Sequence, residues 1–596
     1  MNLNTKLPYH EVWLYKFIFH RKGPILPHPV CLIAHELKSG RLLKIFQDEL
    51  TNLTTPPFDT GDQNLFVSYF IPNELHCYLA LEWPLPVNII DLFPEFRCST
   101  NGLKEPKKSK LTDALKEFKL SPIDESLEAS VEHMVLKDGP WSQTEKQVLF
   151  HYGELFVASL VLLLDKMEDH LVRELPEVLQ RSRYMVAITK MESYGIPIDT
   201  ERLTVLKDKW SDIRETLILE VKDSFHIYDK SGFKTKLFEK YLESQDIPWS
   251  KTKTGRLDLR KETFIQMGES YPQIQPLAAL RRNLSNLNKL KITVDPDGRT
   301  RCELKPFMTI TGRNAPSSNK FMFNLPKWLR SLIKPPEGHG LAYLDWSYQE
   351  IGIAAALSGD SNLKNSYLSG DPYLAFAKKI GAIPEGATKE SYRELRNLFK
   401  EVVLAVHYGM LAKSLSKKIE KTETEARELL NQHKQTYPTF WKWSDDNVNY
   451  YNIKGELWSG YGWYLRLGAD KFRELSVRNF LMQSNGSEML RLACTIALEN
   501  NIKVIATVHD GILIEFLLEQ SEEQISIFKE IMLEASKRVL EGFELNVDVL
   551  PIYYPERFKD PDGQPMWELV WSIISELDNS SVVTVHREPP FRVGFW

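Results

Sequence analysis

The sequence predicts a multidomain protein of the α/β and α+β classes, and three observations support this prediction. The chain has 596 residues, which at about 150 residues per domain corresponds to about four packing units. Residues 1–170 alternate strand-like apolar runs with helical segments, as expected of a mixed α/β unit. Residues 180–300 and 355–460 have helical periodicity, whereas residues 461–575 return to a mixture of strand and helix.

The individual elements follow from local patterns. Short β-prone apolar runs predict strands at 30–34, 65–70 and 87–92, and residues 146–167 predict a helix. A capping box at Thr422 and Glu425 predicts the start of a further helix. The stretch 576–596 has Asn, Ser and Pro clusters and predicts a loose tail. Residues 279–292 predict an amphipathic helix with these basic side chains exposed: Arg281, Arg282, Lys289 and Lys291.

Composition and charge limit the classes of protein to consider. Apolar residues make up 43% and charged residues 26% of the chain, as in ordinary soluble globular proteins. The formal net charge is −5, so a nucleic-acid partner would have to be held by local basic patches. The five cysteines have no CxxC spacing, which indicates reduced thiols and no zinc site. The apolar run at 160–164 is too short to span a bilayer, and we expect a cytoplasmic protein without a membrane partner.

Two acidic residues are predicted to lie at strand ends. The apolar run 341–344 ends in Asp345 and is followed by apolar residues at helical spacing, which predicts a strand, a turn and a helix. Residues 504–515 place His509 and Asp510 between two β-prone runs, which predicts a hairpin with an acid at its tip. One such acid is most often an ordinary turn residue. Two on neighbouring strands can share a pair of divalent ions about 3.5–4 Å apart and support phosphoryl transfer.

A helix between the two acids has a second distinctive pattern. Arg396, Lys400, Leu404 and Tyr408 recur every four residues, so their side chains drift by only about 40° per step along one face. Arginine and lysine one turn apart suit the phosphates of a triphosphate, and the tyrosine ring could close over a base. Taken alone, the same pattern also fits a surface helix with basic residues at i and i+4, and both interpretations stay open.

The ordered set of motifs resembles that of family A DNA polymerases, the bacterial DNA polymerase I type. The set is Asp345-x-Ser347-x-x-Glu350, Arg396-x3-Lys400-x7-Tyr408-Gly409 and His509-Asp510, supported by Thr311-Gly312-Arg313 and Asn479-x-x-Met482-Gln483. The resemblance covers about residues 180–570. It implies an RNase H-like domain of the 3′–5′ exonuclease type followed by a right-hand polymerase. The expected divisions are 1–175 for the exonuclease-like domain, 176–300 for the thumb, 301–355 and 479–575 for the palm, 356–478 for the fingers and 576–596 for the tail.

The resemblance also implies the catalytic roles of the site residues. Asp345 and Asp510 would bind two Mg²⁺ ions, one lowering the pKa of the primer 3′-hydroxyl and the other steadying the departing pyrophosphate. Arg396 and the catalytic Lys400 would neutralise the triphosphate. The other nucleotide-binding residues would be Glu350, which excludes a 2′-hydroxyl, Leu404 at the nucleotide sugar and Tyr408 near the templating position.

The partners implied by the resemblance are primer–template DNA and deoxynucleoside triphosphates, with the protein acting as a monomer. The expected DNA-binding residues are Arg313, Asn479 and Gln483 in the minor groove, His509 at the primer end, and Arg281, Arg282 and Lys289 on the phosphate backbone.

Two positions depart from the family pattern. Leu404 stands where the family usually has Phe or Tyr, so its packing on the sugar would be aliphatic and discrimination against sugar analogues should change. Gly511 replaces a common acidic residue and removes an auxiliary carboxylate.

The first domain is predicted to have lost proofreading. In the family, an Asp-x-Glu on the first strand and further aspartates, one after a Tyr on a late helix, hold two metal ions. Here Lys16, Ile18 and Phe156 align with acidic positions, and these side chains cannot supply the hard oxygen ligands that Mg²⁺ requires. Three other acids could rescue the site but are expected to be ordinary solvated residues: Glu74, Asp91 and Glu154.

Two alternatives to a DNA polymerase remain. One is a non-catalytic nucleic-acid-binding protein derived from a polymerase, and the other is a nuclease that acts through the first domain. The joint presence of Asp345, Asp510, Arg396, Lys400 and Tyr408 disfavours the first alternative, and the missing acids disfavour the second.

Overall fold

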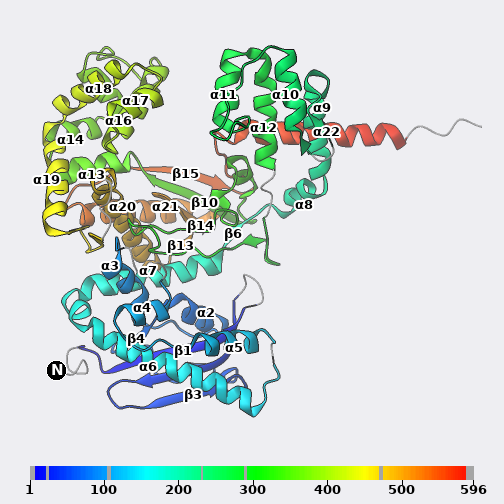
Figure 1. Ribbon diagram of the computed structural model, residues 1–596. Helices are drawn as coiled ribbons and strands as arrows, with labels where there is room; N and C mark the ends of the chain where they lie inside the picture. The colour runs from blue at the N-terminus through cyan, green and yellow to red at the C-terminus, as the bar shows by residue number, and fades with distance from the viewer. Residues whose placement is uncertain are drawn as a thin grey trace, which may run out of the picture. The chain divides into compact units, whose positions relative to one another are not determined.

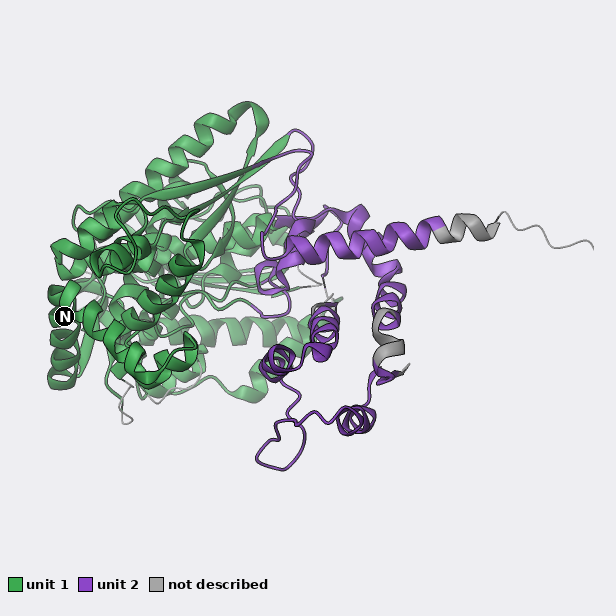
Figure 2. Ribbon diagram, turned by 90° about the horizontal axis from the view of Figure 1, so that it is seen from above, with its two compact units in different colours: residues 1–195, 303–316, 339–551 green, residues 196–302, 317–338, 552–596 purple. Residues whose placement is uncertain are grey.

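The computed structural model describes residues 7–21, 26–103, 109–137, 139–229, 232–287, 292–468 and 474–585. The chain forms two compact units, which Figure 2 shows in green and purple. Unit 1 contains residues 1–195, 303–316 and 339–551, and unit 2 contains residues 196–302, 317–338 and 552–596.

The N-terminal part of unit 1 is built on a five-stranded sheet of order β3-β2-β1-β4-β5. Strand β1 is antiparallel to β2 and parallel to β4, which is parallel to β5. The runs expected as strands lie in β2, β4 and β5, so this part has the mixed α/β character that the sequence predicts. The strands are β1 (Glu11–His20), β2 (His28–Glu36), β3 (Leu42–Phe46), β4 (Asn64–Ser68) and β5 (Asn88–Asp91).

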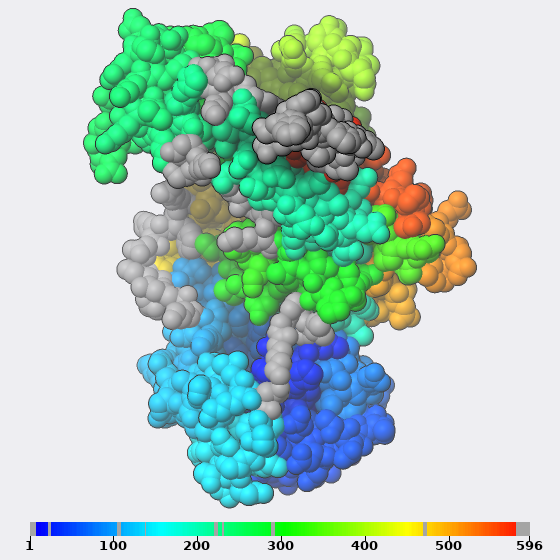
Figure 3. Space-filling view, turned by 90° about the vertical axis from the view of Figure 1, so that its right-hand side faces the viewer, coloured from blue at the N-terminus to red at the C-terminus, as the bar shows by residue number. Residues whose placement is uncertain are grey.

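Helices cover both faces of this sheet (Figure 1). On one face, Gly153 of α6 lies so close to Ile33 of β2 that a Cβ atom there would be 2.3 Å from Ile33 Cδ1. On the other face, Tyr78 of α2 packs on Tyr15 and Phe17 of β1. In Figure 3 the cyan residues, which include those of α6, lie beside the blue N-terminal residues. The helices are α1 (Gln47–Leu50), α2 (Pro72–Ala80), α3 (Leu92–Thr100), α4 (Leu111–Glu117), α5 (Glu125–Leu136), α6 (Gln143–Arg173) and α7 (Leu175–Tyr194).

Helix α6 is the one helix of the described residues that could cross a membrane by length and composition, with a mean hydropathy of 1.7 over its most apolar window. Of this window, 44% is buried inside the protein, and the helix packs against β1 and β2. The core helix of a soluble domain has the same properties, so α6 is weak evidence for a membrane partner.

The second sheet of the chain has four strands in the order β13-β14-β10-β15. Strand β10 ends next to the turn that leads into helix α13, and β13 and β14 form an antiparallel hairpin, as the sequence predicts for both acids. Helices α20 and α21 pack together beside it. These elements are β10 (His339–Trp346), β13 (Lys503–Val508), β14 (Gly511–Leu517), β15 (Val547–Tyr553), α20 (Glu474–Glu499), η5 (Leu518–Gln520) and α21 (Ser521–Val539).

A helical segment lies between β10 and α20 in the sequence. Thr422 caps α18 through the predicted capping box with Glu425, and Pro438 begins the next helix. The elements are α13 (Gln349–Ser358), α14 (Ser361–Leu368), α15 (Pro372–Lys379), α16 (Arg393–His407), α17 (Ala412–Lys418), α18 (Glu423–Thr436), α19 (Pro438–Lys454), β11 (Glu456–Trp458) and β12 (Tyr464–Arg466).

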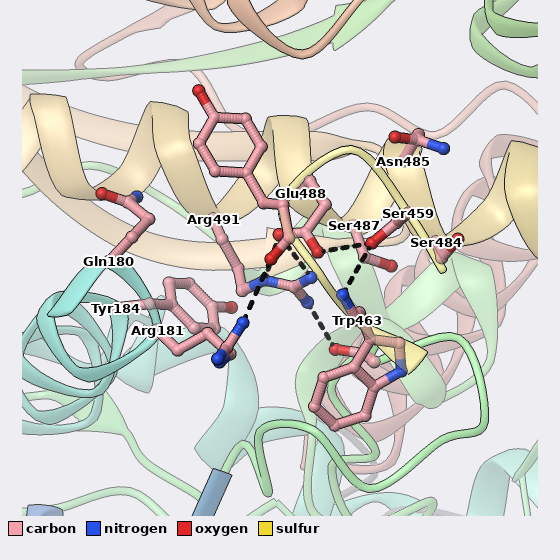
Figure 4. Close-up of polar contacts among 12 residues, drawn as sticks. Gln180, Arg181, Tyr184, Ser459, Trp463, Ser484, Asn485, Ser487, Glu488 and Arg491 are labelled. Carbon is pink, nitrogen blue, oxygen red and sulfur yellow. Dashed lines mark hydrogen bonds and ion pairs between the residues drawn. The ribbon is translucent and has the colours of Figure 1, made fainter. Parts of the chain in front are cut away.

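A buried polar network, which we call the polar junction, joins the first domain to the second sheet within unit 1 (Figure 4). Arg181 of α7 makes two 2.7 Å bonds to the buried Glu95 and donates to the Tyr461 carbonyl at 3.0 Å. Arg491 of α20 pairs with Glu488 at 2.8 Å and donates to the Gly312 carbonyl. Because buried charges are tolerated only when they are paired, these contacts fix how the segments pack.

Gly312 is required by this junction. Its φ is +73°, and a Cβ atom there would lie 3.0 Å from Arg491 Nη1. The glycine of the Thr-Gly-Arg motif therefore allows the loop to approach the arginine.

Unit 2 is mainly helical. The prediction of a loose tail from residue 576 is wrong for residues 576–585, because they continue helix α22. Residues 586–596 lie outside the described part of the chain. Helix α22 packs on α9 and η4, where the rings of Trp567 and Trp328 are 6.3 Å apart. The elements are β6 (Ile196–Pro197), α8 (Thr200–Asp208), α9 (Trp210–Phe225), β7 (Tyr228–Asp229), β8 (Gly232–Phe233), α10 (Thr235–Ser244), α11 (Lys261–Ser270), η2 (Pro272–Ile274), α12 (Gln275–Leu287), β9 (Arg299–Thr300), η3 (Met322–Asn324), η4 (Lys327–Leu332) and α22 (Gln564–Val585).

Candidate active site

The two predicted acids meet at one edge of the four-stranded sheet. Asp345 is the penultimate residue of β10 and pairs across the sheet with Gly511 of β14. Asp510 immediately precedes Gly511, in a tight turn whose other residue, His509, has a φ of +58°. The sheet register therefore brings the carboxylates together although 164 residues (346 to 509) separate them in the sequence.

A cavity of about 320 Å³ contains both acids, and we call it the acid cavity. It also contains the predicted nucleotide-binding residues Arg396, Lys400 and Leu404 of α16 and Glu350 of α13. The remaining lining residues are Trp346, Ser347, Tyr348, Gln349, Ile351, Tyr373 and Asp548. The structure thus assembles, in one place, most of the residues that the motifs select.

The two aspartates of the acid cavity have raised pKa values, because their charged forms are disfavoured there. Burial, followed by the negative charges of Asp510 and Asp548, raises the pKa of Asp345 well above its usual value. Burial likewise raises the pKa of Asp510, although the positive charge of Arg313 opposes the shift. The Oδ1 atom of Asp345 is buried and, among the described residues, has no hydrogen-bond partner. A cation would relieve each of these penalties.

This arrangement fits hydrated Mg²⁺ ions better than a metal held by protein alone. Within the described residues, no group of three His, Cys, Asp or Glu side chains could hold a metal ion by itself. Mg²⁺ is usually bound through one or two carboxylates together with waters and substrate phosphates. Two adjacent carboxylates with an unpartnered oxygen match that requirement.

The cations of α16 differ in how they are held. Arg396 is buried: its Nε donates to Asp371 at 2.5 Å and its Nη2 to Tyr348 Oη at 3.2 Å. Its guanidinium also lies 5.4 Å from the centre of the Tyr373 ring. Lys400, one turn later, is exposed. The arginine is fixed in place before any ligand arrives, and the lysine is free to move.

Glu350 is the centre of a second set of contacts. The Tyr408 hydroxyl donates to Glu350 Oε2, and Arg313 Nη2 lies 3.9 Å from Glu350 Oε1. Burial raises the pKa of the Glu350 carboxyl. Tyr408, at the C-terminal end of α16, does not line the acid cavity itself.

The other predicted DNA contacts in unit 1 lie outside the acid cavity. Asn479 Nδ2 donates to the Tyr408 carbonyl at 3.4 Å, which links α20 to the end of α16. Gln483, one turn further along α20, is half-buried, and His509 is exposed at the hairpin tip.

Comparison with known proteins identifies the family. The family described as DNA polymerase family A matches residues 200–550, more than half of the chain. The chain belongs to family A of the DNA polymerases.

Individual relatives are distant. The chain is 25% identical to DNA polymerase I of Aquifex aeolicus over 394 residues, which cover 63% of this chain and 66% of that protein. It is 25% identical to the thermostable DNA polymerase I of Thermus aquaticus over 308 residues, 47% of this chain and 36% of that one. The DNA polymerase of Escherichia phage T5 is 22% identical over 404 residues, 57% of this chain and 47% of the phage protein. The chain thus spans between about a third and two thirds of these relatives.

A solved structure supports the fold. The POL domain of Pol1 from M. smegmatis, in complex with DNA primer-template and dNTP, has a TM-score of 0.71 and 18% identity. The match covers 92% of this chain and 95% of that one. The chain therefore has the exonuclease-type and right-hand polymerase fold that the motifs imply. Family A polymerases use divalent metal ions, in agreement with the chemistry of the acid cavity.

The predicted backbone contacts of this family A chain on α12 need correction. Arg281 is not an exposed cation, because its guanidinium lies 4.4 Å from the ring centres of Phe233 and Phe264 and donates to the Leu259 carbonyl. Arg282 is exposed, as expected. Lys289 and Lys291 lie outside the described residues.

In the first domain, the side chains that replace acids lie together. Lys16 Nζ is 2.8 Å from Glu74 Oε1 and 4.7 Å from the centre of the Phe156 ring. Lys16, Phe156 and Ile18 line a cavity of about 640 Å³, whereas Glu74 is fully buried and does not line it. An ammonium group thus stands at the position where the resemblance predicts a metal ligand.

The three acids that could have replaced the missing metal ligands of the first domain already have partners within the protein. Glu74 and Asp91 are fully buried, so the expectation that they are solvated is wrong. Glu74 accepts from the Phe17 N–H, and Asp91 accepts from the N–H groups of Phe70, Ile71 and Phe93. Glu154 pairs with Lys44.

Sequence reasoning missed four residues of the acid cavity region. Tyr348, Asp371 and Tyr373 position Arg396, and only Tyr348 lies inside a quoted motif. Asp548 stands on β15, where an aspartate in a β-prone run is unusual and could have served as a signal.

Proposed function

We propose that this protein is a template-directed DNA polymerase that adds deoxynucleotides to a primer 3′ end. The observation that carries the proposal is that Asp345 and Asp510 line one cavity with the cations Arg396 and Lys400. Metal-binding acids next to phosphate-binding cations are the parts that phosphoryl transfer requires.

Asp345 and Asp510 would hold two Mg²⁺ ions, which when bound supply the charge that stabilises the attacking and leaving oxygens. Burial raises the pKa of both carboxyls, and bound cations would favour their charged forms.

Arg396 and Lys400 would bind different phosphates of the triphosphate. Arg396 is held by Asp371 and Tyr348, which leaves its Nη1 group outside these contacts for a phosphate oxygen. Lys400 brings a mobile point charge to a second phosphate. A fixed donor orients the nucleotide, while a mobile donor can follow the charge as it develops.

The nucleotide sugar would meet Glu350 and Leu404. Glu350 is held by Tyr408 and Arg313, so its carboxylate cannot move aside for a 2′-hydroxyl. Leu404 lines the cavity with an aliphatic surface.

DNA would be contacted by Arg313, Asn479 and Gln483 in the minor groove, by His509 at the primer end and by Arg282 on the backbone. Arg281 packs on Phe233 and Phe264 within unit 2 and would not contact DNA. The proposed divisions follow the sequence boundaries, except that α7 packs on α20 in unit 1. We therefore place the start of the thumb after Gly195. The protein would act as a cytoplasmic monomer.

The first domain would not proofread, because the acids near the expected metal position already have partners. Glu74 forms an ion pair with Lys16, and Asp91 accepts hydrogen bonds from three backbone N–H groups. A Mg²⁺-dependent shortening of a primer with a mismatched 3′ end would contradict this proposal.

Extension of a labelled primer by one correct nucleotide tests the main proposal. The unchanged protein and Asp446→Asn, which removes an exposed acid outside the cavity, should extend the primer, and Asp510→Ala should not. Binding of primer–template without extension by the unchanged protein would instead support a non-catalytic nucleic-acid-binding protein. Degradation of the primer would support a nuclease.

A further inference from the structure

The acid cavity has no room for a carboxylate on its β14 side. Gly511 lies opposite Asp345, at the position where the family commonly has an acidic residue. A Cβ atom at Gly511 would lie 2.1 Å from Tyr343 Oη and 2.3 Å from Tyr343 Cζ. Tyr343, two residues before Asp345 on β10 and on the same face of the sheet, therefore fills the space that a side chain at 511 would need.

The β15 side of Asp345 carries an acid instead. Strand β15 is the other neighbour of β10, and the Ser347 N–H donates to the Asn546 carbonyl at 2.8 Å. This bond joins the end of β10 to the start of β15, so the two strands run antiparallel. Two residues along each strand from this bond, Asp345 and Asp548 come opposite each other on one face.

Asp548 is exposed to the cavity and unpaired by any cation of the described residues. It lines the acid cavity with Asp345 and Asp510, and no ion pair among the described residues involves it. Its negative charge acts on Asp345, Tyr348 and Tyr367. Like charges on directly opposite strand positions are destabilising, and aspartate is depleted in strands. The local fold gives no reason for an acid here, whereas a cation in the cavity would.

We propose that Asp548 is the auxiliary carboxylate of this active site and strengthens divalent-cation binding at Asp345 and Asp510 from the β15 side, in place of the acid that Gly511 lacks. The inference rests on the proposed function. Since no three acids of the described residues form a ready metal cage, Asp548 acts on the cations through space and through their bound waters. It is a positioning residue for the metal site and does not touch the reacting atoms.

Binding of Mn²⁺ alone, followed by electron paramagnetic resonance of the free ion, tests this role without catalysis. Asp548→Asn should raise the Kd for Mn²⁺ by about tenfold, the usual effect of losing an outer-shell carboxylate. Asp548→Glu keeps the charge and should keep the Kd, and Asp446→Asn removes an exposed acid outside the cavity as the matched control.

A Kd for Asp548→Asn equal to that of Asp446→Asn would overturn the inference. So would an equal rise for Asp548→Asn and Asp548→Glu, because it would indicate a structural role. In primer extension, Asp548→Asn should raise the Mg²⁺ concentration for half-maximal rate by a similar factor and leave the nucleotide KM at saturating Mg²⁺ unchanged. Failure of the unchanged protein to extend a primer would refute the proposed function, whereas the Mn²⁺ series alone decides the role of Asp548.

Discussion

The chain contains two cavities at which the sequence resemblance predicts metal-binding acids, and they differ in what their carboxylates contact. In the acid cavity, the Asp345 Oδ1 atom is buried without a donor among the described residues. In the first domain, Glu74 is paired with Lys16 and Asp91 accepts three backbone N–H groups. The contrast teaches that the number of acids near a site says little. A carboxylate is open to a cation only where the protein has left it without donors.

The strongest test of this comparison replaces Asp345, whose Oδ1 atom lacks a donor among the described residues. Asp345→Asn should lower the primer extension rate by about three orders of magnitude, or about 4 kcal/mol of barrier, because a metal ligand is lost. The same change should not lower the thermal unfolding temperature, since it removes a repulsion with Asp510 and Asp548. Single-turnover extension and thermal unfolding measure the two effects. A variant that extends normally, or one that is strongly destabilised, would break the comparison.

The opposite result is expected at the paired acid. Lys16→Met leaves the fully buried Glu74 without its cation and should lower the free energy of unfolding by about 3–5 kcal/mol. The double variant Lys16→Met, Glu74→Gln keeps an acceptor for the Phe17 N–H and should recover most of the loss. Urea unfolding measures both, and primer extension at a temperature where both are folded should be unaffected. Equal stability of the single variant and the unchanged protein would show that the pair is not coupled.

The buried histidines His407 and His433 extend the comparison to titratable groups that have no oppositely charged partner among the described residues. His407 and His433 pack at 5.1 Å, and burial lowers the pKa of His407 to about 4 and that of His433 well below its usual value. Both are neutral in the folded state and gain a proton on unfolding below pH 6.5, so stability is present above that pH and is lost as pH falls toward 4. The loss from His407 should be on the order of 3 kcal/mol.

Urea unfolding at a series of pH values, followed by far-UV circular dichroism, measures this loss of stability. The double variant His407→Phe, His433→Phe should lose less stability between pH 6.5 and 5 than the unchanged protein. Identical slopes would exclude the pair as the cause.

The smallest expected effect concerns the sugar side of the acid cavity. Leu404→Phe should change the ratio of dideoxynucleotide to deoxynucleotide incorporation several-fold, since one wall of the cavity changes from aliphatic to aromatic and a few contacts are worth about 1 kcal/mol. Leu395→Phe places the same residue at an exposed position of α16 and is the matched control. An unchanged ratio in Leu404→Phe would show that this residue does not contact the sugar.

Motif spacing predicted the acid cavity well because its residues lie on regular elements. A strand end, a hairpin tip and one helix face each translate spacing into position, so Asp345, Asp510, Arg396, Lys400 and Leu404 were expected together and are found together.

Contacts between distant segments could not be predicted in the same way. The place of Asp548 depends on the pairing of β15 with β10, which no local pattern reveals. Arg281 was expected in solvent, but two phenylalanines brought near by folding hold it. Glu74 was expected in solvent because its partner, Lys16, lies 58 positions away. Local polarity indicated surface in both cases, and tertiary pairing decided otherwise.

The polar junction gives the first domain a structural role within unit 1. Arg181 and Glu95 belong to that domain, yet Arg181 supports the loop that carries Tyr461, next to the Ser459–Glu488–Arg491 chain beneath the Thr-Gly-Arg motif. A fragment that starts at residue 196 would lack Arg181 and Glu95. The loop that carries Tyr461 would lose its hydrogen bond to Arg181 and become exposed to water. We therefore expect the first domain to stabilise these loops through the polar junction, independently of any nuclease activity.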